Sequence, residues 1–501
     1  MRKSIGIFLS LILSVSMLFG AGCVRVENPL TDDEEREEVM KIIDGVDLDA
    51  GSDYEGSLSV YYEDSPSEVK IMDAFLSAFQ EAYPNIEITK MPTVTSNYQR
   101  LIEMRHSTAY NSQRFDTMPD IIWTTNEILA DWVDKRMLMP VNYFDERDSG
   151  FSAQDTFVSS MLEDSMLGES TYMYPRDYNQ FVMYYNRKLL KLAGIPESRI
   201  PSDRALTHDE FDQLLRDIRA AFEKMGDDEI NPENNRAYNG VRALDAVWAW
   251  GSLCWPTLKS FGGSVVNENG EVDFNNEENI AAATYLRELI KDKLTFGTGS
   301  SMHAQFTNQM TVLCIETRSV LTNLIDRSNS NLLAVKPEDL GVAPMPSVGN
   351  DDNYAIGSGC SGYAMYRYAQ HPTEAWLFLK FMASEAGQNA FCDSGNGIPS
   401  NKNLLTKADA VWRNPSAAEV QGLVNFNQDA FIYQWDESAC TLQDFKKNIS
   451  KLQARQSVST RMTKVLEACL NTSDSNYEDA IKEEFSEGEK AINRIIQSAT
   501  K

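Results

Sequence analysis

The stretch "YPRDYNQFVMYYN", from Tyr174 to Asn186, mixes four tyrosines with charged and amide side chains and then becomes almost continuously apolar. A core strand would not carry Arg176 and Asp177, because charged side chains are rarely buried without a partner. A solvent-exposed loop would not carry so many rings. The stretch is typical of neither environment, so its explanation depends on how the whole chain is organised.

The composition indicates an acidic, globular protein. The chain has 501 residues, with 46 basic and 74 acidic side chains and a net charge of −28. This balance argues against nucleic-acid binding, which needs clustered Lys and Arg to neutralise phosphates. It also argues against a polybasic membrane-binding patch. We expect a well-solvated acidic surface and a chain long enough for more than one domain.

The N-terminus has the pattern of a secretory signal peptide. Arg2 and Lys3 precede the apolar run "IGIFLSLILSVSMLF", which is shorter than the ~20 residues of a membrane-spanning helix. The run ends in "FGAGC", which resembles a bacterial lipobox whose Cys23 becomes the lipidated first residue, although Gly20 replaces the usual leucine. The alternative is ordinary signal-peptidase cleavage nearby. We interpret residues 1–23 as a lipoprotein signal peptide that leaves the protein anchored on the extracytoplasmic face of the membrane.

The remaining cysteines and the histidines give no indication of a metal site or a cofactor. The six later cysteines are far apart, with no C-x-x-C pair, and we expect buried free thiols. The four histidines never occur at ligand spacing. No metal and no cofactor are predicted.

Strands and helices alternate along most of the chain. Residues 24–56 are acidic and poor in aromatics, which predicts a tether with a short helix at "EEREEVMKIID". An ordered fold then begins at "SLSVYY", a strand, followed by the helical pattern "SPSEVKIMDAFLSAFQEAYP", in which Ser65 and Glu68 have capping-box spacing. The strand "NIEITKM" comes next. This alternation predicts an α/β architecture.

The order of several passages resembles the bacterial extracellular solute-binding proteins of the maltose-binding-protein-like family, the receptors of carbohydrate ABC transporters. Each passage is a weak match alone, but together they follow the family's order from about Leu58 to about Leu405. The passages are "FQEAYPNIEIT", "MPDIIWTTNEILADWVDKRMLMPVNYF", "MYPRDYNQFVMYYNRKLLKLAGI", "FGGSVVNENGEVDFNNEENIAAATYLREL", "LGVAPMPS", "EAWLFLKFMASEAGQNAF" and "GIPSN".

The resemblance implies a periplasmic-binding-protein-like fold, in which two α/β lobes are joined by crossover segments and enclose a ligand cleft. Residues 57–180 and 356–400 would form lobe one, and residues 181–355 and 401–501 lobe two. The opening stretch then has an explanation. "YPRDY" would end the first lobe and "FVMYYN" would begin the second, so the segment needs polar residues beside the cleft and apolar residues in a buried strand.

The candidate ligand-binding residues lie where these passages would border the cleft. Sugars present hydroxyl groups at their rims and apolar C–H patches on their faces, so their sites combine aromatic rings with hydrogen-bonding groups. Trp123 is equally compatible with a core position, and Arg176 with Asp177 could form a structural ion pair. The glycines of "YAIGSGCSG" suit close backbone approach; a dinucleotide site is rejected because a strand, not a helix, follows. The predicted residues are Tyr61, Tyr62, Glu63, Trp123, Asn126, Arg176, Asp177, Tyr178, Trp248, Trp250, Trp255, Glu316, Arg318, Ser358 and Trp435.

The resemblance therefore implies a non-enzymatic, monomeric receptor that captures a carbohydrate, with an oligosaccharide favoured, and delivers it to the permease subunits of an ABC transporter. One alternative is a secreted glycoside hydrolase with Asp177 and Glu316 as its carboxylate pair. Another is a receptor of the same family for a non-sugar ligand such as a peptide or a polyamine. The supply of aromatic residues favours sugars.

The lipobox interpretation predicts that Cys23→Ser releases the protein from the membrane into the medium or periplasm. Two acyl chains anchor a protein stably, whereas one gives only marginal binding. Fractionation of cells expressing the variant, followed by immunoblotting, measures the release. Retention of the variant in the membrane fraction would contradict the interpretation.

Overall fold

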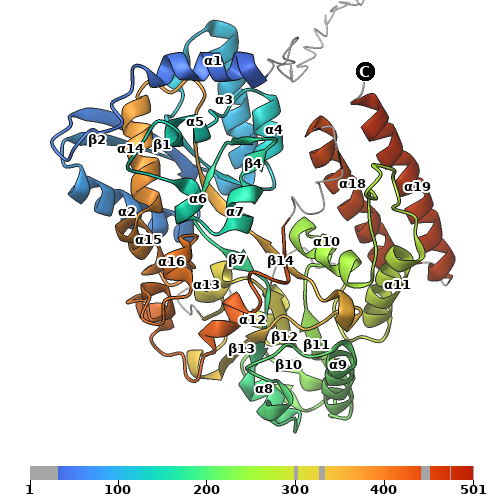
Figure 1. Ribbon diagram of the computed structural model, residues 1–501. Helices are drawn as coiled ribbons and strands as arrows, with labels where there is room; N and C mark the ends of the chain where they lie inside the picture. Colours follow the sequence, from blue (N-terminus) through green and yellow to red (C-terminus); the bar gives the residue numbers. More distant parts are fainter. Residues whose placement is uncertain are drawn as a thin grey trace, which may run out of the picture.

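The computed structural model describes residues 32–297, 303–325, 333–441, 449, 452–473 and 476–499. The predicted signal peptide and Cys23 lie outside these residues. Two sheets flanked by helices form two lobes, with β7 and β14 between them (Figure 1). This arrangement confirms the predicted α/β class. Within the described part of the chain, no helix is long and apolar enough to span a bilayer.

The first lobe is built on a five-stranded sheet with the order β2-β1-β3-β15-β6. The strands β1 and β2 are parallel, as are β1 and β3, while β15 runs antiparallel to both β3 and β6. Ser65 caps α2 by accepting a hydrogen bond from the backbone N–H of Glu68, as its sequence spacing predicts. The bounds are β1 (Gly56–Glu63), α2 (Pro66–Ala82), β2 (Ile86–Thr93), α3 (Tyr98–Ser112), β3 (Ile121–Thr125), β6 (Tyr174–Pro175), β15 (Ser361–Met365), α14 (Pro372–Ala383) and α15 (Glu385–Cys392).

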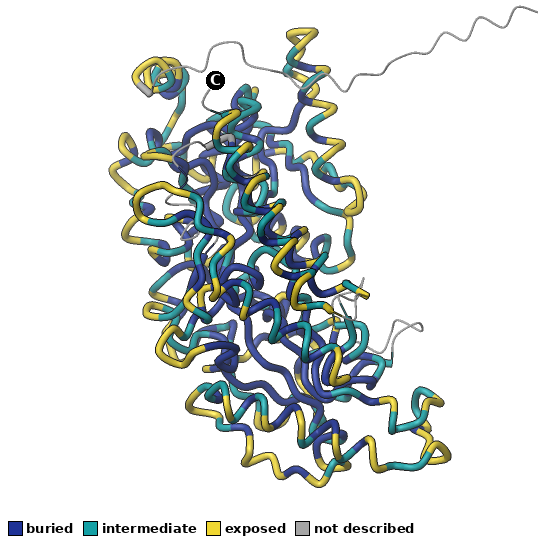
Figure 2. Tube along the Cα trace, turned by 90° about the vertical axis from the view of Figure 1, so that its right-hand side faces the viewer, coloured by how far each residue is buried: buried dark blue, intermediate teal, exposed yellow. Residues whose placement is uncertain are grey.

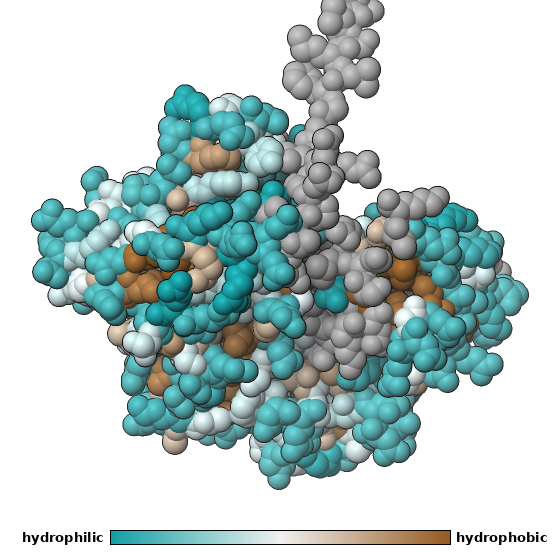
Figure 3. Space-filling view, turned by 45° about the horizontal axis from the view of Figure 1, so that its top comes forward, coloured by the Kyte–Doolittle hydropathy of each residue, from teal (hydrophilic) through white to brown (hydrophobic). Residues whose placement is uncertain are grey.

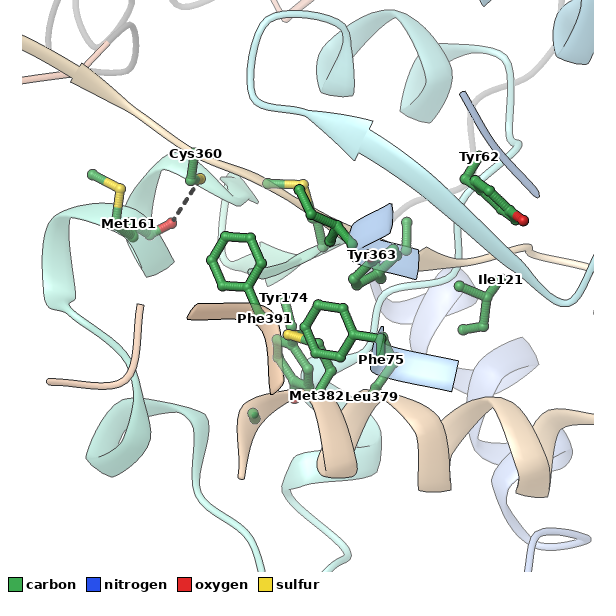
Figure 4. Close-up of a cluster of buried hydrophobic side chains, with 14 of the residues drawn as sticks. Tyr62, Phe75, Ile121, Met161, Tyr174, Cys360, Tyr363, Leu379, Met382 and Phe391 are labelled. Atoms are coloured by element: carbon green, nitrogen blue, oxygen red, sulfur yellow. Dashed lines mark hydrogen bonds between the residues drawn. The ribbon is translucent and has the colours of Figure 1, made fainter. Parts of the chain in front are cut away.

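The core of this lobe is rich in aromatic rings. The ring of Phe75 on α2 stacks on Phe391 with centroids 5.8 Å apart and meets Tyr363 edge-on. Figure 4 shows Phe75, Phe391 and Tyr363 close together among the buried side chains of this core, with Tyr62 to one side. Helices cover both faces of the sheet, so side chains of successive strand residues are buried on both sides.

The segment predicted to be a tether is packed from Asp32 onward. Helix α1 (Asp32–Ile43) buries Val39 and Ile43 in the core of the first lobe. Arg367 pairs with Glu35 at 2.6 Å and with Glu38 at 2.9 Å. The acidic segment therefore contains an amphipathic helix. Its carboxylates pair with Arg367 of the first lobe, and its apolar face contributes to the core.

The second lobe has a four-stranded sheet with the order β11-β12-β8-β13. The central strand β8 runs antiparallel to both neighbours, and all five of its residues are buried. This strand is the apolar half of the stretch from Tyr174 to Asn186. Thr207 and Glu210 form a capping box at the start of α9. The bounds are β8 (Val182–Asn186), α9 (His208–Glu223), β11 (Arg242–Asp245), α10 (Gly251–Ser260), α11 (Glu277–Lys291), β12 (Thr311–Glu316), α13 (Leu321–Ile325) and β13 (Leu340–Pro344).

A small sheet joins the lobes. Strands β7 (Asn179–Gln180), β14 (Ile356–Gly359) and β16 (Ala439–Cys440) pair in the order β16-β14-β7. The glycines of "YAIGSGCSG", the segment in which the chain crosses back to the first lobe, allow the close backbone contacts that the sequence predicts. A Cβ at Gly357 would lie 2.0 Å from the backbone oxygen of Ser252, and one at Gly362 would lie 2.2 Å from the backbone oxygen of Tyr174.

The C-terminal part of the chain divides its contacts between the lobes. Helices α18 (Leu452–Asn471) and α19 (Tyr477–Ser498) pack on α11 in the second lobe, and α18 also lies against α4 of the first. Trp412 and Phe431 belong to the same buried cluster as residues of the first lobe. The remaining helices and strands are α4 (Leu129–Asp134), α5 (Asn142–Asp145), α6 (Ala153–Thr156), α7 (Ser159–Asp164), β4 (Met166–Leu167), β5 (Ser170–Thr171), α8 (Arg187–Leu192), β9 (Ile230–Asn231), β10 (Arg236–Ala237), α12 (Ala304–Thr307) and α16 (Lys402–Leu405).

Burial follows this architecture. Figure 2 shows buried residues running through the middle of the molecule and exposed residues on its outer turns. The face seen in Figure 3 is mainly hydrophilic, with a few apolar patches.

The packing of α1 predicts that Val39→Ala destabilises the protein by about 1–3 kcal/mol, because it removes buried methyl groups and leaves a cavity. Lys41→Ala, on the exposed side of the same helix, should have little effect. Denaturant unfolding of both variants measures the difference. Equal stabilities would mean that α1 does not contribute to the core.

Candidate ligand-binding site

A cavity of about 400 Å³ lies between the two lobes. Its walls come from the ends of β1 and β3, the start of α2, the crossings at β7 and β14, the start of α10, and the residues that follow β12. This volume falls within the range of small-molecule sites. Because the carboxyl ends of parallel strands meet at one edge of a sheet, the ends of β1 and β3 bring their side chains to the same wall.

The two crossings are tied together at Ser361. The carboxylate of Asp177 accepts hydrogen bonds from the Ser361 backbone N–H and from its hydroxyl group, each at 2.7 Å. The backbone N–H of Arg176 donates to the Ser361 carbonyl, also at 2.7 Å. All three residues line the cleft. Their bonds fix one crossing against the other.

The buried guanidinium of Arg176 completes this group of hydrogen-bonded residues, which we call the knot. Arg176 pairs with Glu68 on α2 at 2.6 Å, and its Nη1 also donates to the Tyr363 hydroxyl. Burial opposes its charge, but the neighbouring Glu68 carboxylate raises the pKa of Arg176, which stays protonated. Its guanidinium lies 5.0 Å from the ring centroid of Phe391 and 5.9 Å from that of Trp123.

The lobes meet directly on one side of the cleft. Glu127, just after β3, accepts hydrogen bonds from the Trp250 indole N–H at 2.8 Å and from the Ser252 hydroxyl at 3.1 Å. Trp250 also meets Phe181 edge-on, with ring centroids 5.2 Å apart. Since Glu127 belongs to the first lobe and its donors to the second, this contact bridges the two lobes beside the cleft.

Four polar atoms of cleft-lining residues are buried without a hydrogen-bond partner in the structure: Trp123 Nε1, Arg176 Nε, Asn179 Oδ1 and Ser358 Oγ. Buried polar groups are rarely left unpaired in folded proteins. Two of these atoms are donors, one is an acceptor, and the hydroxyl can act as either. A bound molecule with both donors and acceptors could satisfy them.

Glu63, at the end of β1, is a half-buried carboxyl group in the same wall. Burial, together with the neighbouring Glu68 carboxylate, raises the pKa of Glu63 to about 7. A carboxyl group with a raised pKa is stabilised in its ionised form by hydrogen-bond donors or by a positively charged neighbour.

The family assignment follows from a comparison with known proteins. Residues 74–419 match the family model described as bacterial extracellular solute-binding protein. The chain belongs to this family. Proteins of this solute-binding family are non-enzymatic, so the glycoside hydrolase alternative is set aside.

Individual solute-binding proteins are distant in sequence. The maltodextrin-binding protein MdxE of Bacillus subtilis is 22% identical over 51% of this chain, and the match spans 56% of MdxE. The maltose-bound MalE3 of T. maritima superposes with a TM-score of 0.64 at 18% identity, covering 87% of this chain and all of MalE3. UgpB of Mycobacterium tuberculosis, in complex with glycerophosphocholine, has a TM-score of 0.66 at 16% identity, covering 89% of this chain and all of UgpB. The two structures show the fold.

The structure brings about half of the predicted site residues together in the cleft of this solute-binding protein. The crossover segment borders the cleft, as expected. Asp177 lines it, but both of its carboxylate oxygens already accept hydrogen bonds from Ser361. Its position favours the structural role over ligand contact. The predicted residues that line the cleft are Glu63, Trp123, Asn126, Arg176, Asp177, Trp250 and Ser358.

The other predicted aromatic residues do not line the cleft. Tyr61 and Tyr62 are buried in the first lobe because helices cover both faces of its sheet. The hydroxyl group of buried Tyr178 donates to the Gln180 side chain. Trp248 and Trp255 lie in the core of the second lobe, which needs large apolar groups around α10. Trp435 packs against the hydrophobic core that contains the first-lobe residues.

Two predicted charged residues are also placed elsewhere. Glu316 is buried beside His303, 3.6 Å away, and does not line the cleft. Arg318 is fully buried, donates to the backbone oxygen of Trp412 at 2.7 Å and lies over the Phe431 ring. Burial lowers the pKa of Arg318 to about 10. Arg318 therefore attaches the segment after residue 401 to the second lobe, and Thr317 before it reaches the cleft instead.

Several cleft residues were not anticipated from the sequence. Glu127 and Asn179 are sequence neighbours of the predicted residues Asn126 and Tyr178, and this proximity is the signal that could have identified them. Glu68, Thr317, Gly359, Cys360 and Ser361 also line the cleft without having been predicted as site residues. The rest are polar or apolar side chains whose sequence context is unremarkable: Ser65, Ser67, Ile71, Thr125, Phe181, Ser252, Ser319, Val320, Asn323, Phe391 and Asn396.

The six later cysteines all lie among the described residues. Cys254, Cys314, Cys360, Cys392, Cys440 and Cys469 are buried and form no disulfide with one another, as predicted. Over the same part of the chain, no group of three or more His, Cys, Asp or Glu side chains has metal-binding geometry.

The Glu127 contact predicts that Glu127→Ala opens the ligand-free protein. Charge-assisted hydrogen bonds contribute about 1.5–3 kcal/mol each, and a change of that size shifts a two-state population roughly tenfold or more. Small-angle scattering should therefore report a larger radius of gyration for the variant. Glu81→Ala, on the exposed surface of α2, is the matched control. Identical scattering from both variants would show that Glu127 does not hold the lobes together.

Proposed function

We propose that this protein is a lipid-anchored receptor that captures a saccharide, with an oligosaccharide favoured, and delivers it to the permease of an ABC transporter. The observation that carries the proposal is the cleft itself. Two tryptophans and two phenylalanines share a cavity with many hydroxyl and amide groups. Ring faces suit the C–H patches of sugars, and the polar groups suit their hydroxyl rims.

The unpartnered atoms support a polyhydroxylated ligand. A sugar hydroxyl group both donates and accepts, so one molecule could satisfy the donors Trp123 Nε1 and Arg176 Nε and the acceptor Asn179 Oδ1. Ser358 Oγ adds a group that can take either role. Binding would then replace unpaired buried groups with hydrogen bonds, which contributes to both affinity and specificity.

The relatives agree with this proposal. MdxE is named as a maltodextrin-binding protein, and MalE3 was solved with maltose. UgpB was solved with glycerophosphocholine, so the same fold also accepts a ligand that is not a simple sugar. The aromatic walls of the present cleft favour a saccharide.

The anchor is proposed from the sequence. Residues 24–31 separate Cys23 from α1, which packs on the first lobe. Eight residues reach at most about 29 Å when fully extended. A lipidated Cys23 would therefore keep the first lobe close to the membrane and the permease.

The proposal predicts that Trp123→Ala lowers affinity for the bound saccharide roughly tenfold or more, because it removes a ring face and an indole donor from the cleft. A glycan panel screened by thermal shift identifies the ligand, and calorimetric titration measures the loss.

Trp248→Ala is the control, since Trp248 is buried in the second lobe outside the cleft. It should lower stability by about 3–5 kcal/mol and leave the affinity of the folded protein unchanged. If Trp123→Ala instead destabilises the protein without weakening binding, Trp123 is a core residue. Failure of every glycan to bind would overturn the saccharide proposal.

A further inference from the structure

The charged groups that line the cleft are mostly acidic. Among the described lining residues, carboxyl groups belong to Glu63, Glu68, Glu127 and Asp177, and the single cation is Arg176. The Arg176 side chain is only 5% exposed, and its guanidinium is bonded to its neighbours. It is therefore poorly placed to balance the charge of an anionic ligand.

Three of the four carboxylates have partners. Glu68 pairs with Arg176, Asp177 accepts from Ser361, and Glu127 accepts from the second lobe. Glu63 differs from them. Within the described residues, no hydrogen bond or ion pair engages its carboxyl group, although it faces the cavity.

The surroundings of Glu63 disfavour an isolated negative charge. Asp64 follows it on the chain and Glu68 faces it from α2, while Arg176, the nearby cation, is already paired with Glu68. Ionised groups removed from water need a partner of opposite charge or hydrogen-bond donors. A positively charged group in the cavity would supply both.

The aromatic residues that line the same cavity as Glu63 can also stabilise a cation. The guanidinium of Arg176 already lies against the rings of Trp123 and Phe391. A ligand ammonium group would meet the same kind of surface, since ring faces attract cations. The unpartnered Ser358 hydroxyl, whose residue is 2% exposed, lines the same cavity and can accept a hydrogen bond.

We propose that the ligand carries a protonated amino group that pairs with Glu63, as in a saccharide with free amino groups, and that acidic saccharides are excluded. This inference rests on the proposed function and specifies its substrate class. The net charge of −28 acts in the same direction, because it attracts cationic ligands and repels anionic ones over longer distances.

Calorimetric titration at low and moderate salt with three saccharides of equal length tests the proposal: glucosamine, N-acetylglucosamine and galacturonate oligomers. The glucosamine oligomer should bind roughly tenfold or more tightly than its N-acetylated counterpart, since a charged hydrogen bond replaces a neutral one. The galacturonate oligomer should not bind measurably. Spermidine, a cation without a sugar ring, is the fourth probe.

Glu63→Gln should remove the preference for the free amine, so that the glucosamine and N-acetylglucosamine oligomers bind the variant with similar affinities. Asp64→Asn is the matched control, because it removes a carboxylate beside Glu63 that lies outside the cleft lining. Thermal melting of each variant verifies that it is folded.

The outcomes separate the two proposals. Equal binding of both hexosamine oligomers, binding of the galacturonate oligomer, or an unchanged preference in Glu63→Gln would overturn the amino-group inference and leave the saccharide receptor standing. Binding of spermidine alone, lost in Glu63→Gln, would retain the cation subsite and overturn the saccharide proposal. Binding of none of the four probes would overturn the amino-group inference, while the wider glycan panel decides the proposed function.

Discussion

The two segments that cross between the lobes are held side by side at their first-lobe ends by a buried knot of residues. Asp177 and Arg176 on one crossing hold Ser361 on the other through backbone and side-chain hydrogen bonds, and Glu68 neutralises the guanidinium. A buried charge that loses its partner typically costs about 3–5 kcal/mol, so these groups specify one geometry strongly. The knot lies in the wall of the cleft, where it positions the groups around it.

Two kinds of contact join the lobes around the cleft. The small sheet β16-β14-β7 connects them through backbone pairing, whereas Glu127 contacts Trp250 and Ser252 of the second lobe through side-chain hydrogen bonds. Hinge motions of two-lobed proteins are absorbed by a few residues in the crossings. Contacts such as that of Glu127 can break on opening without disturbing either core. Ligand capture and release then require only small changes in free energy.

The sequence was sufficient to predict the fold. The alternation of strands and helices predicted the α/β class, and the resemblance to solute-binding proteins implied two lobes and a crossing after Tyr178. The acidic helix α1 was mistaken for a tether because composition does not show that Val39 and Ile43 share one face and pack on a distant surface. Only the tertiary structure provides Arg367 as the partner of its carboxylates.

The site was harder to predict than the fold. Residues at strand ends and crossings, such as Glu63, Trp123 and Ser358, were found because topology places them at the cleft. Aromatic residues near them, such as Trp248, were assigned wrongly, because a ring that fills a core looks the same in sequence as a ring that stacks on a ligand. The contact of Glu127 with the second lobe could not be predicted, because it joins segments that are far apart in the chain.

The most direct test of this account is the distribution of distances between the lobes, measured by pulsed electron spin resonance. Spin labels at Arg100→Cys on α3 and Lys224→Cys after α9 would report it, since both positions are exposed and the native cysteines among the described residues are buried. With Ser361 intact, the account predicts a narrow distribution that moves as a whole when ligand binds. In Ser361→Ala the distribution should broaden while the protein remains folded. An equally narrow distribution in that variant would contradict the claim that the knot, by holding the crossing segments side by side, limits how the lobes move relative to each other.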